Sequence, residues 1–114
     1  MVYTVPVEVF KSETFDAWFS SLRDRRAKVR IAARIDRVSL GNFGDVKPVG
    51  SGVSELRIDY GPGYRVYFTR RGLAIVLILC AGDKRTQSED IELAIDIAAS
   101  WRDTSDGDKK KAAV

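Results

Sequence analysis

The feature of this sequence that most directly suggests chemistry is a pair of arginines on neighbouring segments. Residues 53–60 and 64–69 are rich in β-branched and aromatic side chains and flank a Gly-Pro-Gly turn, a pattern typical of a β-hairpin. In this hairpin Arg57 lies opposite Arg65, although like charges placed directly across a ladder destabilise a sheet. Two guanidinium groups held side by side can instead bind an anion, and a phosphate suits their paired donors.

The other cross-strand pairs separate a polar face of the hairpin from an apolar one. Side chains alternate along a strand, so Glu55 is expected opposite Tyr67 on the face of the arginines. If that face is exposed, both arginines can be ordinary solvated residues, or Glu55 and Asp59 can neutralise them. This interpretation stays open beside phosphate binding. On the apolar face we expect three pairs, Tyr60–Tyr64, Ile58–Val66 and Leu56–Phe68.

Composition limits the chemistry further. The 114 residues contain no histidine and one cysteine, Cys80, which lies in an apolar run at residues 73–81. Histidine-dependent catalysis, a disulfide framework and a cysteine-based metal site are therefore excluded, and we expect no cofactor or metal. Hydrophobic residues at 45% and charged residues at 31% are typical of one folded domain. We expect a cytoplasmic protein, because no signal-peptide pattern and no apolar run of membrane length is present.

A strand and two helices are predicted before the hairpin. Residues 3–10 alternate and predict a strand, which Pro6 places at an edge or at a strand start. Ser12 then caps a short helix, and Asp24 caps a second one over residues 25–40, which Gly41 ends. The first helix has an apolar stripe at the spacing i, i+3, i+4, i+7, formed by Phe15, Trp18, Phe19 and Leu22.

The second helix is strongly basic outside its apolar stripe. Such a run is either a solvated face or a surface that contacts a polyanion or an acidic protein. In the second case Arg34 and Arg37 are candidates for RNA binding. Lys47, in a glycine-rich loop predicted over residues 41–52, could flank the arginine pair. The stripe itself consists of Ala27, Ile31, Ile35 and Val38.

The hairpin continues into a three-stranded meander and a last helix. Residues 73–81 predict the most buried strand, and Thr86-Gln-Ser-Glu89 is a capping box that opens a helix through about residue 101. This helix is apolar on more than one stripe, so it must bury a second face on the sheet or against another chain. A polar tail at residues 103–114 is expected to be disordered.

Together these elements predict one α+β domain over residues 1–102. Its small antiparallel sheet, made of the N-terminal strand and the meander, packs against the helix hairpin, with the third helix at the C-terminal end.

Several of these segments resemble the RelE/ParE toxin superfamily of bacterial toxin-antitoxin modules, most closely its HigB-like, phage-derived branch of addiction-module killer proteins. The resemblance lies in GVSELRI at residues 52–58, GYRVYF at 63–68 and AGDKRTQ at 81–87, followed by Asp90-Ile91 and Ala94. It covers roughly residues 3–101. It implies a RelE-like fold and a ribosome-dependent mRNA endonuclease, in which the 2′-hydroxyl of the mRNA attacks the adjacent phosphate. It also implies a helix-turn-helix (HigA-like) antitoxin as the partner in a hetero-oligomer.

The resemblance also implies roles for individual residues. Arg65 matches the phosphate-binding arginine, Arg57 a basic residue of the preceding strand, and either Lys84 or Arg85 the basic residue after the last strand. Some relatives carry a tyrosine or histidine on the last helix as general base, and this chain has neither there. Tyr67, or a lysine with a depressed pKa, is the expected substitute. A gyrase poison of the ParE type and a non-enzymatic module that binds nucleic acid or protein remain alternatives.

Overall fold

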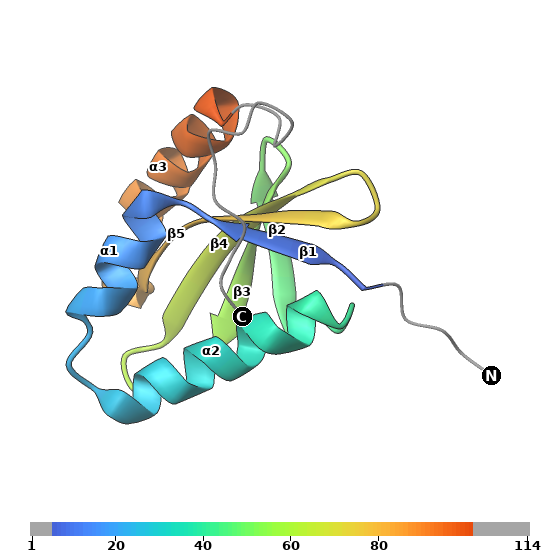
Figure 1. The fold of residues 1–114 in the computed structure, drawn as a ribbon. Coiled ribbons are helices and arrows are strands. Elements are labelled where there is room, and N and C mark those ends of the chain that lie inside the picture. The colour runs from blue at the N-terminus through green and yellow to red at the C-terminus, as the bar shows by residue number, and fades with distance from the viewer. Residues whose placement is uncertain (1–5, 102–114) are drawn as a thin grey trace.

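A five-stranded β-sheet forms the centre of the structure, a computed structural model that describes residues 6–101 (Figure 1). The strands are β1 (Glu8–Lys11), β2 (Val46–Gly50), β3 (Val53–Ile58), β4 (Tyr64–Arg71) and β5 (Ile75–Asp83), in the spatial order β1-β5-β4-β3-β2. The helices are α1 (Glu13–Ser21), α2 (Arg25–Ser39) and α3 (Gln87–Ser100), and a 3-10 turn, η1 (Lys84–Thr86), precedes α3. The predicted α+β class is confirmed.

The sheet is mixed, whereas the sequence predicted an antiparallel one. β2, β3, β4 and β5 form an antiparallel meander, but β1 pairs with β5 in parallel. A parallel pair requires a long connection, which the two helices and the first strands of the meander supply. β1 lies at an edge, as expected. It begins at Glu8, and the predicted start of this strand and the predicted tail lie largely outside the described residues.

The other edge strand, β2, lies within the segment that was predicted to be a loop. Its Pro48 suits an edge, because a missing N–H leaves no gap in a ladder on the solvent side. The tight turn into β3 uses Gly50 and Gly52, whose φ angles of 112° and 78° are unfavourable for other residues. The glycines therefore serve a turn, as predicted, but the segment before them is a strand.

The first two helices begin as the sequence predicts, and the α2 stripe is buried, whereas Phe15 is the only fully buried residue of the predicted α1 stripe. The Ser12 hydroxyl accepts a hydrogen bond from the N–H of Phe15 at 2.9 Å, and the Asp24 carboxylate accepts from the N–H groups of Arg26 and Ala27. All four residues of the predicted α2 stripe are buried.

Within residues 6–101 no helix combines the length and the apolar character that crossing a membrane would require.

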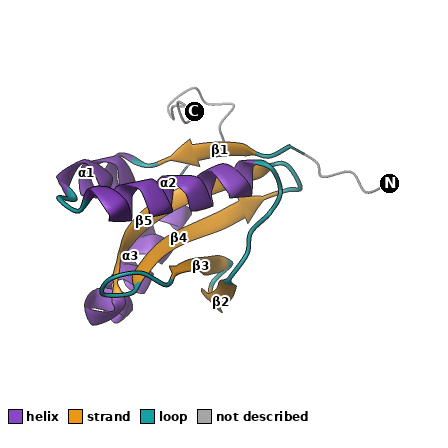
Figure 2. Ribbon diagram, turned by 90° about the horizontal axis from the view of Figure 1, so that it is seen from below, coloured by secondary structure: helices purple, strands orange, loops and turns teal. Residues whose placement is uncertain are grey.

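The sheet carries a hydrophobic core on each face. α1 and α2 cover one face, and α3 covers the other, where it packs mainly on β5, β4 and β3 (Figure 2). Ala94 of α3 is fully buried, and Trp101 at its end is 4% exposed. The third helix thus packs most of its apolar side chains against the sheet. β5 lies between the two cores and is the most buried strand, as predicted.

The predicted capping box of α3 does not form. The N-cap Thr86 makes no capping hydrogen bond, and its hydroxyl instead donates to the Asp90 carboxylate at 2.6 Å. Asp83 is the N-cap of the preceding 3-10 turn, and its side chain accepts a hydrogen bond from the N–H of Arg85 at 2.9 Å. The side chain that caps the helical segment is therefore Asp83, at the end of β5, and not Thr86.

Candidate nucleic-acid interface

The predicted arginine pair is present. β3 and β4 are paired so that Arg57 lies opposite Arg65 and Glu55 opposite Tyr67. The predicted apolar pairs are wrong: each β3 residue pairs with a β4 residue two positions earlier than predicted. The reason is that five residues, 59–63, connect the two strands, and not three. The observed pairs on that face are Ile58–Tyr64, Leu56–Val66 and Ser54–Phe68.

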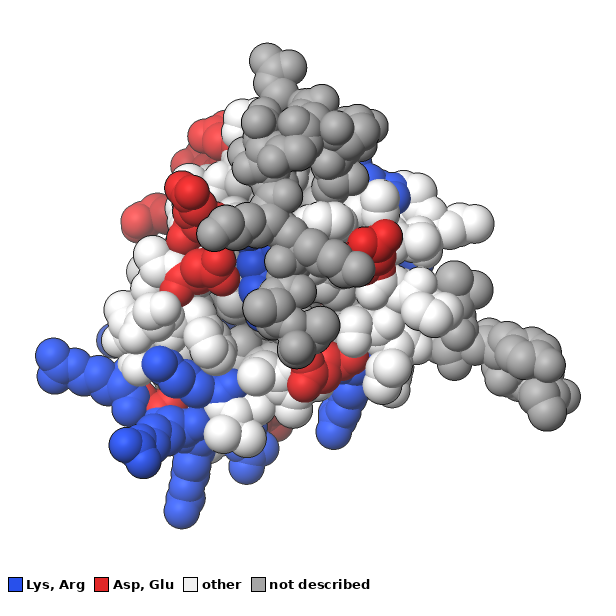
Figure 3. Space-filling view, in the orientation of Figure 1, with Lys and Arg blue, Asp and Glu red and all other residues white. Residues whose placement is uncertain are grey.

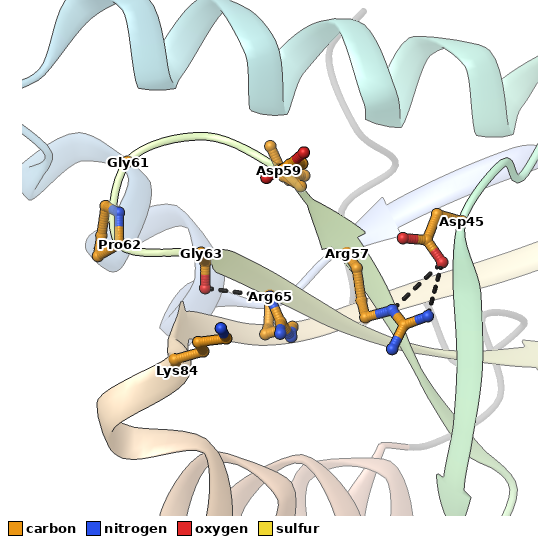
Figure 4. A pocket seen from close by; sticks show the side chains of 9 residues that line it. Asp45, Arg57, Asp59, Gly61, Pro62, Gly63, Arg65 and Lys84 are labelled. Carbon is orange, nitrogen blue, oxygen red and sulfur yellow. Dashed lines mark hydrogen bonds and ion pairs between the residues drawn. The ribbon is translucent and has the colours of Figure 1, made fainter.

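A cleft of about 340 Å³ opens at this end of the sheet, beside the β3–β4 connection and the start of η1 (Figure 4). Three cationic side chains line it: Arg57 from β3, Arg65 from β4 and Lys84 from η1. Gly63 forms part of its wall, at φ 82°. A side chain there would approach Lys84 and Arg65 to 3.4 Å. The cations thus come from three elements that the hairpin and the end of β5 bring together.

Arg65 is the most enclosed of these cations. Its side chain is 12% exposed, and its Nε lies 3.7 Å from a carboxylate oxygen of Glu55. Its Nη1 donates to the carbonyl oxygens of Gly63 at 3.2 Å and Tyr64 at 3.3 Å. The guanidinium is therefore held in place before any ligand arrives, which reduces the ordering cost of binding.

Arg57 is more exposed and is paired with a carboxylate. Its Nη2 and Nε donate to one oxygen of Asp45, at 2.9 Å and 3.2 Å, and these hydrogen bonds raise the pKa of Arg57. The two side chains are 37% and 58% exposed. An exposed ion pair contributes little stability, so a phosphate can compete with Asp45 for this arginine. Neutralisation of the arginine pair by Glu55 and Asp59 was left open by the sequence. Glu55 does pair with Arg65, whereas the partner of Arg57 is Asp45.

The structure distinguishes the two basic residues that follow β5. Lys84 lines the cleft, whereas Arg85 pairs with Asp83 at 2.9 Å and is 81% exposed. The hydrogen bond from Arg85 raises the pKa of this arginine and lowers the pKa of Asp83. Lys84 is therefore the residue that can act with the arginine pair.

Arg34, predicted to bind RNA, is half-buried and forms hydrogen bonds to the backbone. Its guanidinium donates to the carbonyl oxygens of Arg57, Phe43 and Asp45. Burial lowers its pKa, which fits a partly enclosed group. It fastens the segment before β2 to β3. Because it also lines a hollow together with Arg37, RNA binding by Arg34 stays a prediction beside this structural role.

The other two predicted RNA-binding residues are exposed outside the cleft. Arg37 lies on α2 and lines a smaller hollow of about 220 Å³, which Arg30 and Asp59 also line. Lys47 lies on the edge strand β2, opposite Glu55. Lysine and arginine side chains gather around the corner where α1 leads into α2, and acidic side chains lie on the side of α3 (Figure 3). The corner between α1 and α2 is therefore a second gathering of basic side chains besides the cleft.

Tyr67 does not have the environment of a general base. It is 0% exposed in the core beneath α3, and its hydroxyl has no hydrogen-bond partner among residues 6–101. Burial raises the pKa of Tyr67, and the nearby charge of Glu55 raises it further. A base must reach the substrate and accept a proton near neutral pH. The prediction that Tyr67 is the general base is therefore not supported. The sequence pattern did not reveal that α3 covers this face of the sheet.

Three polar residues near the site were not singled out as functional by the sequence. Asp45 has no local signal, because it precedes an edge strand that was predicted as loop. Gln87, the first residue of α3, donates from Nε2 to Glu55 at 2.8 Å. Asp59 lines the cleft beside Arg57 and follows the end of β3. The period-two pattern could have placed Glu55 beside Arg65, since it already put Tyr67 opposite Glu55.

The sequence has a relative with which most of its length can be compared. It is 50% identical to an uncharacterized protein of Haemophilus influenzae over 88 residues, which are 77% of this chain and 89% of that protein. This chain belongs to the family of that protein. No family model matches the chain. The relative's description names no activity, so for this family the cleft is the basis on which an activity can be proposed.

Proposed function

We propose that the protein is the toxin of a type II toxin-antitoxin module of the RelE/ParE superfamily, and that it cleaves mRNA on the ribosome in the cytoplasm. The observation that carries this proposal is the convergence of Arg57, Arg65 and Lys84 on one cleft. Three cations from three elements, two of them directly opposed in a sheet, suit a phosphodiester better than they serve the fold. The α+β fold is compatible with the superfamily.

The proposed reaction needs only the RNA and side chains of the cleft. The 2′-hydroxyl attacks the adjacent phosphorus, the bond from phosphorus to the 5′-oxygen breaks, and a cyclic phosphate and a 5′-hydroxyl result. Arg65 and Arg57 stabilise the additional negative charge of the pentacoordinate phosphate. Removing one such donor costs about 3–4 kcal/mol in acyl-transfer enzymes. Catalysis in this scheme is electrostatic.

Two residues of the cleft are suited to the proton transfers. Asp45 is held by Arg57, which leaves Asp59 as the carboxylate of the cleft that can accept the proton of the 2′-hydroxyl. The Lys84 ammonium can give a proton to the departing 5′-oxygen. This assignment replaces the buried Tyr67.

The proposed antitoxin would bind the basic surface of α2. Val29 is 68% exposed there, and Arg25, Arg26 and Arg30 lie around it beside a shallow hollow. An acidic, amphipathic segment of a helix-turn-helix protein would complement both the charge and the apolar side chain. α3 contributes less to this part of the proposal than the sequence suggested, because most of its apolar residues pack at least partly on the sheet and only Leu93, 41% exposed, is a large apolar side chain left at its surface.

A non-enzymatic nucleic-acid-binding module is the second candidate. The buried position of Tyr67 and the absence of tyrosine or histidine in residues 87–100 favour it, because the usual base of such nucleases is then missing. A gyrase poison would likewise need no base. The non-enzymatic module would use the cleft to bind a phosphate without cleaving RNA, whereas a gyrase poison would not need the cleft cations at all.

Expression of charge-reversal variants separates these functions. Arg65→Glu should abolish growth arrest. Because it also places a carboxylate beside the buried Glu55, the milder Arg65→Ala is expressed alongside it and should abolish arrest in a protein that folds. Arg70→Glu is the matched control, because this exposed arginine lies toward the other end of β4 and does not line the cleft. Folding is checked by circular dichroism, translation and DNA supercoiling are assayed in parallel, and the mRNA is examined for cleavage. A folded Arg65→Glu protein that still arrests translation would show that the proposed site is wrong.

A further inference from the structure

Glu55 is an acidic residue that the sheet buries almost completely. It lies on β3, between Lys47 on β2 and Tyr67 on β4, and is 1% exposed. Burying a carboxylate is costly unless its charge is paired and its oxygens are hydrogen-bonded. The contacts of its two oxygens therefore indicate what this residue does.

Each carboxylate oxygen of Glu55 faces a different element. Oε1 accepts the hydrogen bond from Nε2 of Gln87, at 2.8 Å, and Oε2 lies 3.7 Å from Nε of Arg65. That Nε is itself buried and has no hydrogen-bond partner among residues 6–101. Gln87 thus fixes the carboxylate, and the carboxylate faces the inner side of the arginine.

The remaining nitrogens of Arg65 are used unequally. Nη1 donates to the carbonyl oxygens of Gly63 and Tyr64, whereas Nη2 has neither a hydrogen bond nor an ion pair within the described part of the chain. The protein therefore holds the guanidinium by two of its nitrogens and leaves the third available. Because Arg65 lines the cleft, that third nitrogen can donate to a bound anion.

We propose that Glu55 is a positioning residue, which orients Arg65 for binding a phosphate in the cleft. The inference rests on the proposed function in that the phosphate belongs to RNA. A simpler role for Glu55 is neutralisation of Arg65. The two roles make opposite predictions: loss of the Glu55 charge weakens phosphate binding if the residue positions Arg65, and strengthens it if the residue only neutralises Arg65.

Glu55→Gln separates these roles. The substitution keeps the size of the side chain and an oxygen that can accept from Gln87, and it removes the charge that faces Arg65. The probe is a trinucleotide RNA with 2′-methoxy groups, which cannot be cleaved, and its affinity is measured by fluorescence anisotropy. We expect binding about tenfold weaker than in the wild type, the lower end of the loss seen when a group that orients a metal-binding side chain is removed.

A double-mutant cycle shows whether Glu55 acts through Arg65. In the Arg65→Ala background, Glu55→Gln should cause no further loss of affinity, because the arginine that Glu55 orients is absent. The same variant should raise stability in that background, since it removes an unpaired buried charge. Unchanged or tighter binding by the single variant, or an equal loss in both backgrounds, would overturn the proposal.

Two further variants keep the test decisive. Glu89→Gln, at an exposed position of α3, is the charge-matched control and should leave the affinity unchanged. If Glu55→Gln does not fold, Gln87→Ala releases the same carboxylate and should weaken binding several-fold, again only when Arg65 is present. Trinucleotide binding with an intact cycle but no mRNA cleavage would refute the nuclease alone. Cleavage without coupling between the two residues would refute the positioning role alone, and no binding by the wild type would refute both.

Discussion

Lys84 and Arg85 are adjacent cations, yet the structure predicts that only Lys84 contacts RNA. We consider Lys84→Met and Arg85→Met, which remove one positive charge each and retain an unbranched apolar stem. Lys84 lines the cleft with the two arginines, whereas Arg85 is held by Asp83 and is 81% exposed. The two variants therefore have the same effect on net charge and should differ in their effect on binding.

The size of the difference follows from counterion release. Each phosphate that a protein neutralises on a single strand contributes about −0.7 to the slope of log affinity against log salt concentration. A trinucleotide has two internucleotide phosphates, so the slope can reach about −1.4 when both are neutralised. Lys84→Met should reduce the magnitude of this slope by about 0.7, and Arg85→Met should change it by much less.

The assay is fluorescence anisotropy of the uncleavable trinucleotide RNA over a series of KCl concentrations. The short RNA keeps the measurement within the cleft and limits the contribution of the arginines on α2. Circular dichroism of both variants controls for folding. An equal reduction of the slope by Arg85→Met, or an unchanged slope for Lys84→Met, would refute the assignment of Lys84 to the phosphate site.

Three further predictions follow from individual contacts. Gly82→Ala should lower the free energy of unfolding by about 1–3 kcal/mol in urea titrations, because the added Cβ would lie 1.9 Å from the Asp90 carboxylate; wild-type stability would contradict the close packing of α3 on β5. Asp45→Asn should tighten binding of the trinucleotide by up to about fivefold, since it frees Arg57 from an exposed ion pair, and weaker binding would mean that Asp45 supports the site. Cys80 should stay unreactive toward a thiol reagent at pH 8 until the protein unfolds, because burial raises the pKa of its thiol to about 12; rapid modification of the folded protein would contradict its placement beneath α3.

Much of the fold could be predicted because local signals and tertiary packing agree. Ser12 and Asp24 each cap the helix that the sequence assigned to them, and the α2 stripe is the buried one. The opposed arginines were predicted correctly, but the predicted three-residue turn does not produce them, because it places Arg57 opposite Tyr67. The five-residue connection at residues 59–63 is what brings Arg57 opposite Arg65.

The remaining differences arise where distant segments decide the structure. β2 has no alternating pattern of its own and becomes a strand because β3 offers a free edge. The covering of Tyr67 depends on α3 docking on the second face of the sheet, which a hairpin pattern does not reveal. Likewise, Arg34 satisfies carbonyl groups that lie far from it in sequence. A basic residue on a helix can therefore be structural even in a strongly basic run.

The central claim is that Arg65 and its neighbours act on a phosphodiester of ribosome-bound mRNA. The most direct test is to map and chemically identify the ends of mRNA fragments formed in a reconstituted translation reaction. The wild type should produce fragments with a cyclic phosphate and a 5′-hydroxyl only when ribosomes are present, and a folded Arg65→Ala variant should produce none. Intact mRNA in a reaction that the wild type has stopped, or unchanged cleavage by the Arg65→Ala variant, would contradict the claim.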